Sequence, residues 1–462
     1  MKKTSLLIFF LVSLFYCQAQ DITGTWYGRL VQIDLRLVFH ISEKDGSYQT
    51  LFDSPDQGSK DIPTGKTTFD GTHLTIDIPN LNAQYKGEYS NGEIKGTFTQ
   101  HATPLSLDLS RQETIRKRPQ EPKPPFPYYT EDLTFKNPKA GITLAGTLTL
   151  PQKEGKFPAV VLISGSGAQD RDEKLMGHKP FWIIADYLTR QGIAVLRFDD
   201  RGFGQSGGKF QNATSQDFAT DVQAAVDYLR TRKEIQSTQI GLIGHSEGGM
   251  IAPMVAANNP HIAFIVSLAG VGTKGSDLVV TQAVTFTQAA GGGEEEVKLA
   301  GTTLREASQI VINNPGQQAI GKLDSLYKKY FEIAPSAQSL TPEEKQSSIR
   351  QAIARITDPW MRYFLAYDPV PVLAQVKCPV LALNGEKDLQ VAARENLEGM
   401  RDALQKGGNK QVKIISFPGL NHLFQECEKG TMDEYAEIEQ TFSPEVLKVM
   451  GDWIKEQTQK KK

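Results

Sequence analysis

Short segments of alternating apolar and polar residues run through the first quarter of the chain. Such segments occur at 24–28, 35–39, 74–78 and 96–99. Asp-Gly or Asn-Gly pairs stand between them, at 45–46, 70–71 and 91–92. These pairs favour the tight turns of β-hairpins. Residues 20–112 are therefore expected to form a small antiparallel β-sandwich or barrel domain.

From Tyr129 onward the pattern changes to apolar runs separated by amphipathic stretches. The apolar runs lie at 158–163, 193–198, 240–243, 263–269, 379–383 and 412–417, with helical patterns at 181–190 and 217–232. Continuous apolar runs suit strands that are buried on both faces. Strands that alternate with helices indicate a mostly parallel, doubly wound sheet. Residues 129–462 are thus predicted to form an α/β domain.

Residues 271–369 interrupt this alternation. About a hundred residues is too long for a structureless loop, and helical patterns occur at 294–313, 316–331 and 341–356. The last of these opens with Thr341 and Glu344 at the spacing of a capping box. The insertion is therefore predicted to be a helical lid. It ends in an aromatic stretch, 360–367, in which Trp360, Phe364 and Tyr367 would share one helix face.

A proline-rich stretch separates the two predicted domains. Lys117 to Pro127 contains five prolines among charged residues, a composition that favours an extended, semi-rigid linker. We place this linker at 113–128.

The first residues have the pattern of a secretory signal. Lys2 and Lys3 precede an apolar core from Leu6 to Tyr16, and a cleavage site follows near Ala19. A lipoprotein signal acylated on Cys17 is the alternative, which the bulky Tyr16 disfavours. The prediction is a signal peptide at 1–19 and a secreted or periplasmic protein.

Composition excludes several classes of partner. The chain of 462 residues is 39% hydrophobic and 23% charged, with a formal net charge of -2. Nothing in this balance indicates a nucleic acid or an anionic membrane as a partner. No segment after the signal is apolar enough to span a membrane. The sequence leaves open whether the chain forms a homo-oligomer.

The chemistry centres on Gly244-His245-Ser246-Glu247-Gly248. This G-x-S-x-G motif lies between an apolar strand pattern and a helical pattern, which is the context of a nucleophile elbow. The flanking glycines suit a sharp strand-to-helix turn that lifts the serine hydroxyl out of the sheet. Ser246 is therefore the candidate nucleophile.

A serine nucleophile needs a base and an acid that orients the base. In this fold the chain order is Ser, then Asp or Glu, then His. His422 is the one histidine that follows the last predicted strands, which makes it the candidate base. Asp388 and Glu386 both follow the preceding strand. Asp388 is preferred because it stands far enough beyond Leu383 to reach over the sheet edge.

The tetrahedral intermediate needs preorganised N–H donors. One is expected from Glu247, directly after the nucleophile. The other is expected from the glycine-containing loop 164–170, at Gly167 or a neighbour. The side chain of Glu247 is interpreted as a structural partner rather than a catalyst.

These motifs resemble those of the α/β-hydrolase superfamily. The further stretches 164–172 and 198–206 resemble its secreted bacterial serine carboxylesterases, which carry an N-terminal β-domain. The resemblance covers about residue 131 to the C-terminus and implies Ser246, Asp388 and His422 as the triad. It also implies a structural role for Asp199 and Arg201, which we expect to form a buried ion pair.

The leading hypothesis is a serine esterase that acts on small-molecule carboxylic esters of short to medium acyl chains. A serine peptidase, a scaffold protein on a degenerate hydrolase fold and an acyltransferase are the alternatives. The large propeller and acidic pair of related peptidases are not evident, and the intact triad disfavours a scaffold. No metal motif or dinucleotide fingerprint occurs, so no cofactor or metal is expected. Trp360 and Phe364 are expected to wall an acyl pocket, as aromatic residues often line ligand sites.

Overall fold

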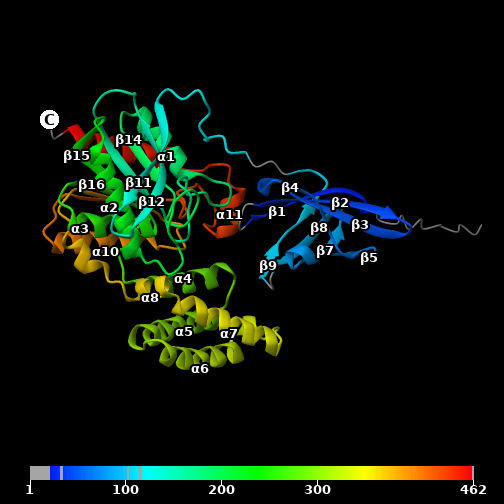
Figure 1. The fold of residues 1–462 in the computed structure, drawn as a ribbon. Coiled ribbons are helices and arrows are strands. Elements are labelled where there is room, and N and C mark those ends of the chain that lie inside the picture. The colour runs from blue at the N-terminus through cyan, green and yellow to red at the C-terminus, as the bar shows by residue number, and fades with distance from the viewer. Residues whose placement is uncertain (1–20, 32–34, 101–102, 114–116, 460–462) are drawn as a thin grey trace, which may run out of the picture. The chain divides into compact units, whose positions relative to one another are not determined.

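The computed structural model describes residues 21–31, 35–100, 103–113 and 117–459 (Figure 1). The chain divides into two compact units, one up to residue 115 and one from residue 116. The predicted signal peptide at 1–19 lies outside the described residues.

The first unit is a curled antiparallel sheet of ten strands, in the order β4-β3-β2-β1-β10-β8-β7-β6-β5, with β9 paired to β8. The end strands β4 and β5 are consecutive in the chain, so the sheet must bend until its two edges meet. Thr50 on β3 and Thr67 on β5 close this gap with a 2.9 Å hydrogen bond between their hydroxyls. The strands are β1 (Gly24–Leu30), β2 (Leu35–Lys44), β3 (Ser47–Ser54), β4 (Ser59–Pro63), β5 (Thr67–Phe69), β6 (His73–Ile78), β7 (Ala83–Ser90), β8 (Glu93–Gln100), β9 (Thr103–Ser106) and β10 (Leu109–Ser110).

Aromatic side chains fill the interior of this partly closed barrel. Phe39 packs against Phe52 and Tyr85, with ring centroids 5.3 and 5.6 Å apart. Trp26 is fully buried, and its indole N–H donates to the Ile22 carbonyl at 2.8 Å. The first unit therefore has a hydrophobic core of its own.

The second unit is built on an eight-stranded sheet in the order β11-β12-β14-β13-β15-β16-β17-β18. The pairs β11–β12 and β12–β14 are antiparallel. The remaining pairs, from β14 to β18, are parallel. This is the α/β-hydrolase architecture, and the predicted fold class is confirmed. The strands are β11 (Tyr129–Asn137), β12 (Ile142–Leu150), β13 (Phe157–Ile163), β14 (Ala194–Phe198), β15 (Ile235–His245), β16 (Ile262–Leu268), β17 (Val380–Gly385) and β18 (Val412–Phe417).

Helices cover both faces of this sheet. Successive residues of a strand point to opposite faces, and the neighbours Val160 and Val161 accordingly enter two different buried clusters. Val160 joins the cluster that contains Leu188 and Met450, whereas Val161 joins the one that contains Leu229. The first face carries α1 (Pro180–Arg190) and α12 (Pro444–Gln459), and the second carries α2 (Ser215–Thr231), α3 (Glu247–Asn258) and α10 (Ala393–Lys406).

The predicted helical insertion lies between β16 and β17. Figure 1 shows α4 to α8 gathered in a separate layer beside the sheet. The capping box is present: Glu344 N donates to Thr341 Oγ1, and Thr341 N donates to Glu344 Oε2. The inserted helices are α4 (Gly275–Ala289), α5 (Glu294–Asn313), α6 (Gln317–Ile333), α7 (Pro342–Thr357), α8 (Pro359–Ala366) and α9 (Pro369–Leu373), and α11 (Met432–Glu437) follows the last strand.

Part of the proline-rich stretch packs onto the second unit. The Arg118 guanidinium donates to the carbonyls of Ala436 and Ile438, at 3.0 Å each. Gln120 donates to the Phe442 carbonyl at 2.7 Å and accepts from Thr441 N at 2.6 Å. This stretch is therefore more than a spacer, because it is hydrogen-bonded to α11 and to the segment between α11 and α12.

These contacts predict a difference between two shortened chains. A chain that begins at residue 117 keeps Arg118 and Gln120, whereas one that begins at residue 127 loses both. Each hydrogen bond contributes about 1 kcal/mol net, so the shorter chain should unfold at a lower temperature. Thermal unfolding of both chains, with Arg118→Ala in the full-length protein as a third sample, measures this. Equal melting temperatures in all samples would contradict the role of the stretch.

Candidate active site

Ser246 sits on a sharp turn between β15 and α3, with φ 52° and ψ -115°. A non-glycine residue in such a conformation costs on the order of 1–3 kcal/mol. The surrounding backbone holds it there, and Ser246 N donates to the Leu268 carbonyl at 2.8 Å. A Cβ at Gly244 would lie 2.0 Å from Gly248 O, and a Cβ at Gly248 would lie 2.1 Å from Ile163 O. Both flanking positions therefore require glycine.

His422 and Asp388 meet at the same edge of the sheet. The loops that carry them follow β18 and β17, which are parallel neighbours. The Nδ1 atom of His422 lies 2.7 Å from Asp388 Oδ2, and both side chains are buried. The other oxygen, Asp388 Oδ1, accepts from the backbone N of Gln390 and of Val391, at 2.8 Å each. These bonds fix the carboxylate and, through it, the orientation of the imidazole.

The alternative acid lies elsewhere. The Glu386 carboxylate accepts from Ser416 Oγ at 2.7 Å, at an exposed position. The geometry therefore favours Asp388 over Glu386 as the partner of His422.

The nucleophile elbow lies against the His422 loop. The rings of His245 and His422 are 4.8 Å apart, and His245 Nε2 lies 3.0 Å from the His422 carbonyl oxygen. Since His245 directly precedes Ser246, the structure brings Ser246, Asp388 and His422 to one edge of the sheet.

The loop after β13 reaches the other side of the elbow. A Cβ at Gly165 would lie 3.3 Å from Ser246 Cβ, so Gly165 borders the serine directly. The Gly165 N–H is engaged, because it donates to Glu173 Oε1 at 2.7 Å. Gly167 lies two residues further on, with φ 95°. Glu247 begins α3, so its N–H has no carbonyl partner within the helix.

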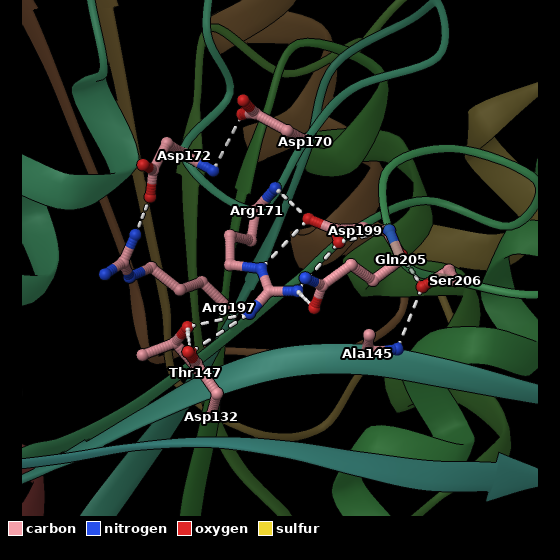
Figure 2. A network of polar contacts seen from close by, with 10 residues as sticks. All are labelled: Asp132, Ala145, Thr147, Asp170, Arg171, Asp172, Arg197, Asp199, Gln205 and Ser206. Carbon is pink, nitrogen blue, oxygen red and sulfur yellow. Dashed lines mark hydrogen bonds and ion pairs between the residues drawn. The ribbon is translucent and has the colours of Figure 1, made fainter.

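Charged side chains bind the loop after β13 to its neighbours in the fold (Figure 2). The Arg171 guanidinium binds Asp199 through two nitrogens, at 3.0 and 2.8 Å. It also bonds to Thr147 on β12 at 2.9 Å. Beside this cluster, Arg197 at the end of β14 pairs with Asp172. The loop is therefore tied to the strands beside it.

The prediction that Asp199 and Arg201 form an ion pair is wrong. Asp199 pairs with Arg171, whereas Arg201 Nε bonds Asp221 on α2 at 2.7 Å. The turn after β14 folds around the Asp199 carboxylate so closely that a Cβ at Gly204 would lie 2.5 Å from Asp199 Oδ2. Arg201 lies on that turn and is directed away from Asp199, toward the helix.

Glu247 connects the elbow to the inserted helices. Its Oε1 accepts from Ser215 Oγ at 2.6 Å and from Trp360 Nε1 at 2.8 Å. Burial raises the pKa of this carboxyl above its ordinary value. Trp360 stacks on Phe364, with ring centroids 5.3 Å apart. Tyr367, expected on the same helix face, lies beyond the end of α8 and packs against Tyr363 instead.

Asp200 is a half-buried residue beneath the loop. Its two oxygens accept from Ser164 Oγ at 2.8 Å and from Gln169 N at 2.9 Å. Burial raises the pKa of Asp200 to about 7, and the nearby Glu247 and Glu173 carboxylates add to this effect.

Sequence reasoning missed Glu173, His245 and Asp200. His245 lies inside the serine motif, but its partner Glu173 is 72 residues earlier in the chain. No local spacing connects such residues. The one available signal was the charged stretch 170–173 in the loop that follows an apolar strand.

The fold and the arrangement at the sheet edge define a hydrolase of the α/β-hydrolase class. Residues 140–416 match the X-Pro dipeptidyl-peptidase (S15) family, and the chain belongs to that family. The match includes Ser246 and Asp388 and ends shortly before His422.

Three individual proteins are similar to this chain at low sequence identity. Esterase EstD of Thermotoga maritima is 26% identical over 347 residues, which cover 74% of this chain and 69% of EstD. A solved Pyrococcus furiosus esterase has 16% identity and a TM-score of 0.43, and covers 71% of this chain and 93% of its own. Est1E of Butyrivibrio proteoclasticus has 16% identity and a TM-score of 0.41, with coverage of 71% and 98%.

The described residues contain neither a metal-binding cluster nor a membrane-spanning helix. Among them, no cluster of three or more His, Cys, Asp or Glu side chains could hold a metal ion. None of the helices in this part of the chain is both long and apolar enough to cross a membrane.

The raised pKa of Asp200 predicts a pH effect on stability. An unfolded Asp titrates near 3.9, so between about pH 4 and 7 the folded protein keeps a proton that the unfolded chain has lost. The contribution of Asp200 to the free energy of unfolding therefore falls as the pH rises through this window. Asp200→Asn removes this dependence and should gain stability relative to the wild type between pH 5 and 8.

Denaturant unfolding at several pH values measures this difference. Asp402→Asn, a change at an exposed carboxylate, is the matched control. Parallel stability curves for the wild type and Asp200→Asn would show that Asp200 is not protonated in the folded state.

Proposed function

We propose that this protein is a serine esterase that cleaves carboxylic esters through an acyl-enzyme on Ser246. The observation that carries the proposal is the 2.7 Å contact between His422 and Asp388 at the edge of the sheet that also presents Ser246. The similarity to Esterase EstD over 74% of the chain supports an ester as the substrate.

The proposed reaction has two steps. His422 takes the proton of the Ser246 hydroxyl while the oxygen attacks the ester carbonyl, and Asp388 stabilises the resulting imidazolium. The same proton then passes to the departing alcohol, which leaves an acyl group on Ser246. A water molecule, deprotonated by His422, attacks this acyl-enzyme. His422 then returns the proton to the departing Ser246 oxygen, which releases the carboxylic acid and restores the serine.

Backbone N–H groups are proposed to stabilise the negatively charged intermediate. Glu247 N is one donor, since it follows the nucleophile and begins a helix. The second is Gly167 N or an adjacent amide, because the Gly165 N–H is already bound to Glu173. Loss of one such donor costs about 3 kcal/mol in comparable sites.

The family description favours a second candidate, a peptidase that releases X-Pro dipeptides from the N-terminus of a peptide. Such an enzyme must bind the ammonium group of its substrate. The buried Glu247 carboxylate beside Ser246 already accepts hydrogen bonds from Ser215 and Trp360, so it is a poor ligand for that group. An acyltransferase would use the same acyl-enzyme and replace water by an alcohol.

Two further features belong to the proposal. We infer that Trp360 and Phe364 wall the acyl side of the site, which suits short to medium acyl chains.

The lysines and apolar core of residues 1–19 support export from the cytoplasm, to the periplasm or the medium. Small-molecule esters are the proposed partners, with no nucleic acid involved.

The proposed activity predicts a clear substrate order. The wild type should hydrolyse p-nitrophenyl acetate and butyrate faster than any Gly-Pro or Ala-Pro anilide at equal concentration. Ser246→Ala should lower ester turnover by at least about 1,000-fold, because the triad acts as a unit, and should leave the melting temperature within a few degrees. Faster cleavage of the anilides by the wild type would favour the peptidase. Ester turnover retained in Ser246→Ala would rule out the proposed mechanism.

The lid assignment predicts a change in chain-length preference. Trp360→Ala opens the proposed wall and should raise the kcat/KM ratio of p-nitrophenyl octanoate to acetate several-fold. Trp360→Phe keeps most of the wall and removes only the N–H donated to Glu247, so it should change this ratio less. Trp182→Ala on α1 is the control. An equal loss on every ester would show that Trp360 serves packing alone.

A further inference from the structure

A buried chain of hydrogen bonds connects three loops around Ser246. The Gly165 N–H, in the loop after β13, donates to Glu173 Oε1 at 2.7 Å. The same oxygen lies 3.0 Å from His245 Nδ1, at the elbow. His245 Nε2 lies 3.0 Å from the carbonyl oxygen of His422, in the loop after β18.

The chemistry of these partners decides the charge of His245. A backbone carbonyl can only accept, so Nε2 must carry a proton. An ionised Glu173 can only accept, so its contact with Nδ1 requires a proton on that nitrogen as well. An imidazole with a proton on both nitrogens is an imidazolium. His245 and Glu173 thus form an ion pair in which both side chains are almost completely buried.

The charged groups around His245 agree with this assignment. Burial opposes the charged form, but the Glu173 carboxylate outweighs it and raises the pKa of His245 above its ordinary value. Asp388, in the loop after β17, adds to the increase. His422 is another titratable neighbour, with its ring 4.8 Å away.

We propose that His245, held as an imidazolium by Glu173, is a positioning residue that fixes the loop of the proposed oxyanion donors and the loop of His422 relative to Ser246. The proposal rests on the proposed serine hydrolase mechanism. Its geometric basis is that His245 joins two segments whose relative position sets the distance between the attacking oxygen, the base and the oxyanion donors. Errors of about 1 Å in such positions can cost 100-fold in rate.

The first test measures the charge of His245 directly. Nitrogen-15 NMR of histidine-labelled Ser246→Ala protein, assigned with a His245→Asn companion, reports the protonation of both ring nitrogens. His245 should remain an imidazolium at pH 7.5, where a histidine with a pKa of about 6.5 is mostly neutral. A neutral His245 at this pH would overturn the proposal. This readout needs no activity, so it stands even if no ester is hydrolysed.

The second test measures catalysis. Glu173→Gln keeps an acceptor for the Gly165 N–H but removes the counter-charge, so His245 should become neutral and lose one of its two bonds. We expect kcat on p-nitrophenyl butyrate to fall about 10- to 100-fold, with KM changed less than about threefold.

His245→Gln should lower kcat similarly, because one amide cannot span both partners with the same geometry. His261→Asn, at an exposed histidine beyond α3, is the matched control and should leave the rate and the pH profile unchanged. Variants of Glu173 and His245 that lower the melting temperature but keep kcat would reduce the pair to a structural role. An inactive wild type would instead refute the proposed esterase function and leave the NMR result to decide the charge.

Discussion

The close approach of three backbone segments at Ser246 is the constraint on which the second unit depends. The end of β15, the start of α3 and the end of β13 meet with no room for a Cβ at Gly244 or Gly248. This contact keeps Ser246 at positive φ and directs it to the edge of the sheet. Any wider turn would separate the serine from the loops after β17 and β18, where Asp388 and His422 lie.

Four acidic side chains are buried or nearly buried around this turn, and they form two groups that differ in the charge of their partners. Asp199 and Glu173 each have a cationic partner, Arg171 and His245. For Asp199, burial is outweighed by the hydrogen bonds with Arg171 and the backbone, and its pKa is lowered. Asp200 and Glu247 have hydroxyl, amide or indole donors but no cation, and burial raises their pKa values. The hydrogen bonds of Asp199 therefore respond to pH differently from those of Asp200 and Glu247, because the pKa of Asp199 is lowered and the other two pKa values are raised.

The inserted helices are coupled to the proposed catalytic residues by few but direct contacts. Trp360 on α8 reaches Glu247, the residue after Ser246, and Thr285 on α4 donates to the Leu389 carbonyl, directly after Asp388. Movements of these helices would therefore act on both sides of the site. The N-terminal barrel has an aromatic core of its own.

The sequence by itself determined the features that depend on local patterns. Strand and helix periods predicted the doubly wound α/β sheet, and the resemblance of the motifs around Ser246, Asp388 and His422 implied the α/β-hydrolase fold. The glycines around Ser246 identified the elbow because a sharp turn needs them at fixed positions. The order of Ser246, Asp388 and His422 followed from the strands that precede them, and Thr341 with Glu344 predicted the start of α7. The tertiary structure alone decided the partners of the buried charges. Asp199 binds Arg171 rather than Arg201, Glu173 reaches His245 across 72 residues, and Glu247 reaches Trp360 across 113. Such pairs depend on how loops from different strands fold over one sheet edge, and no local spacing in the chain records that distance.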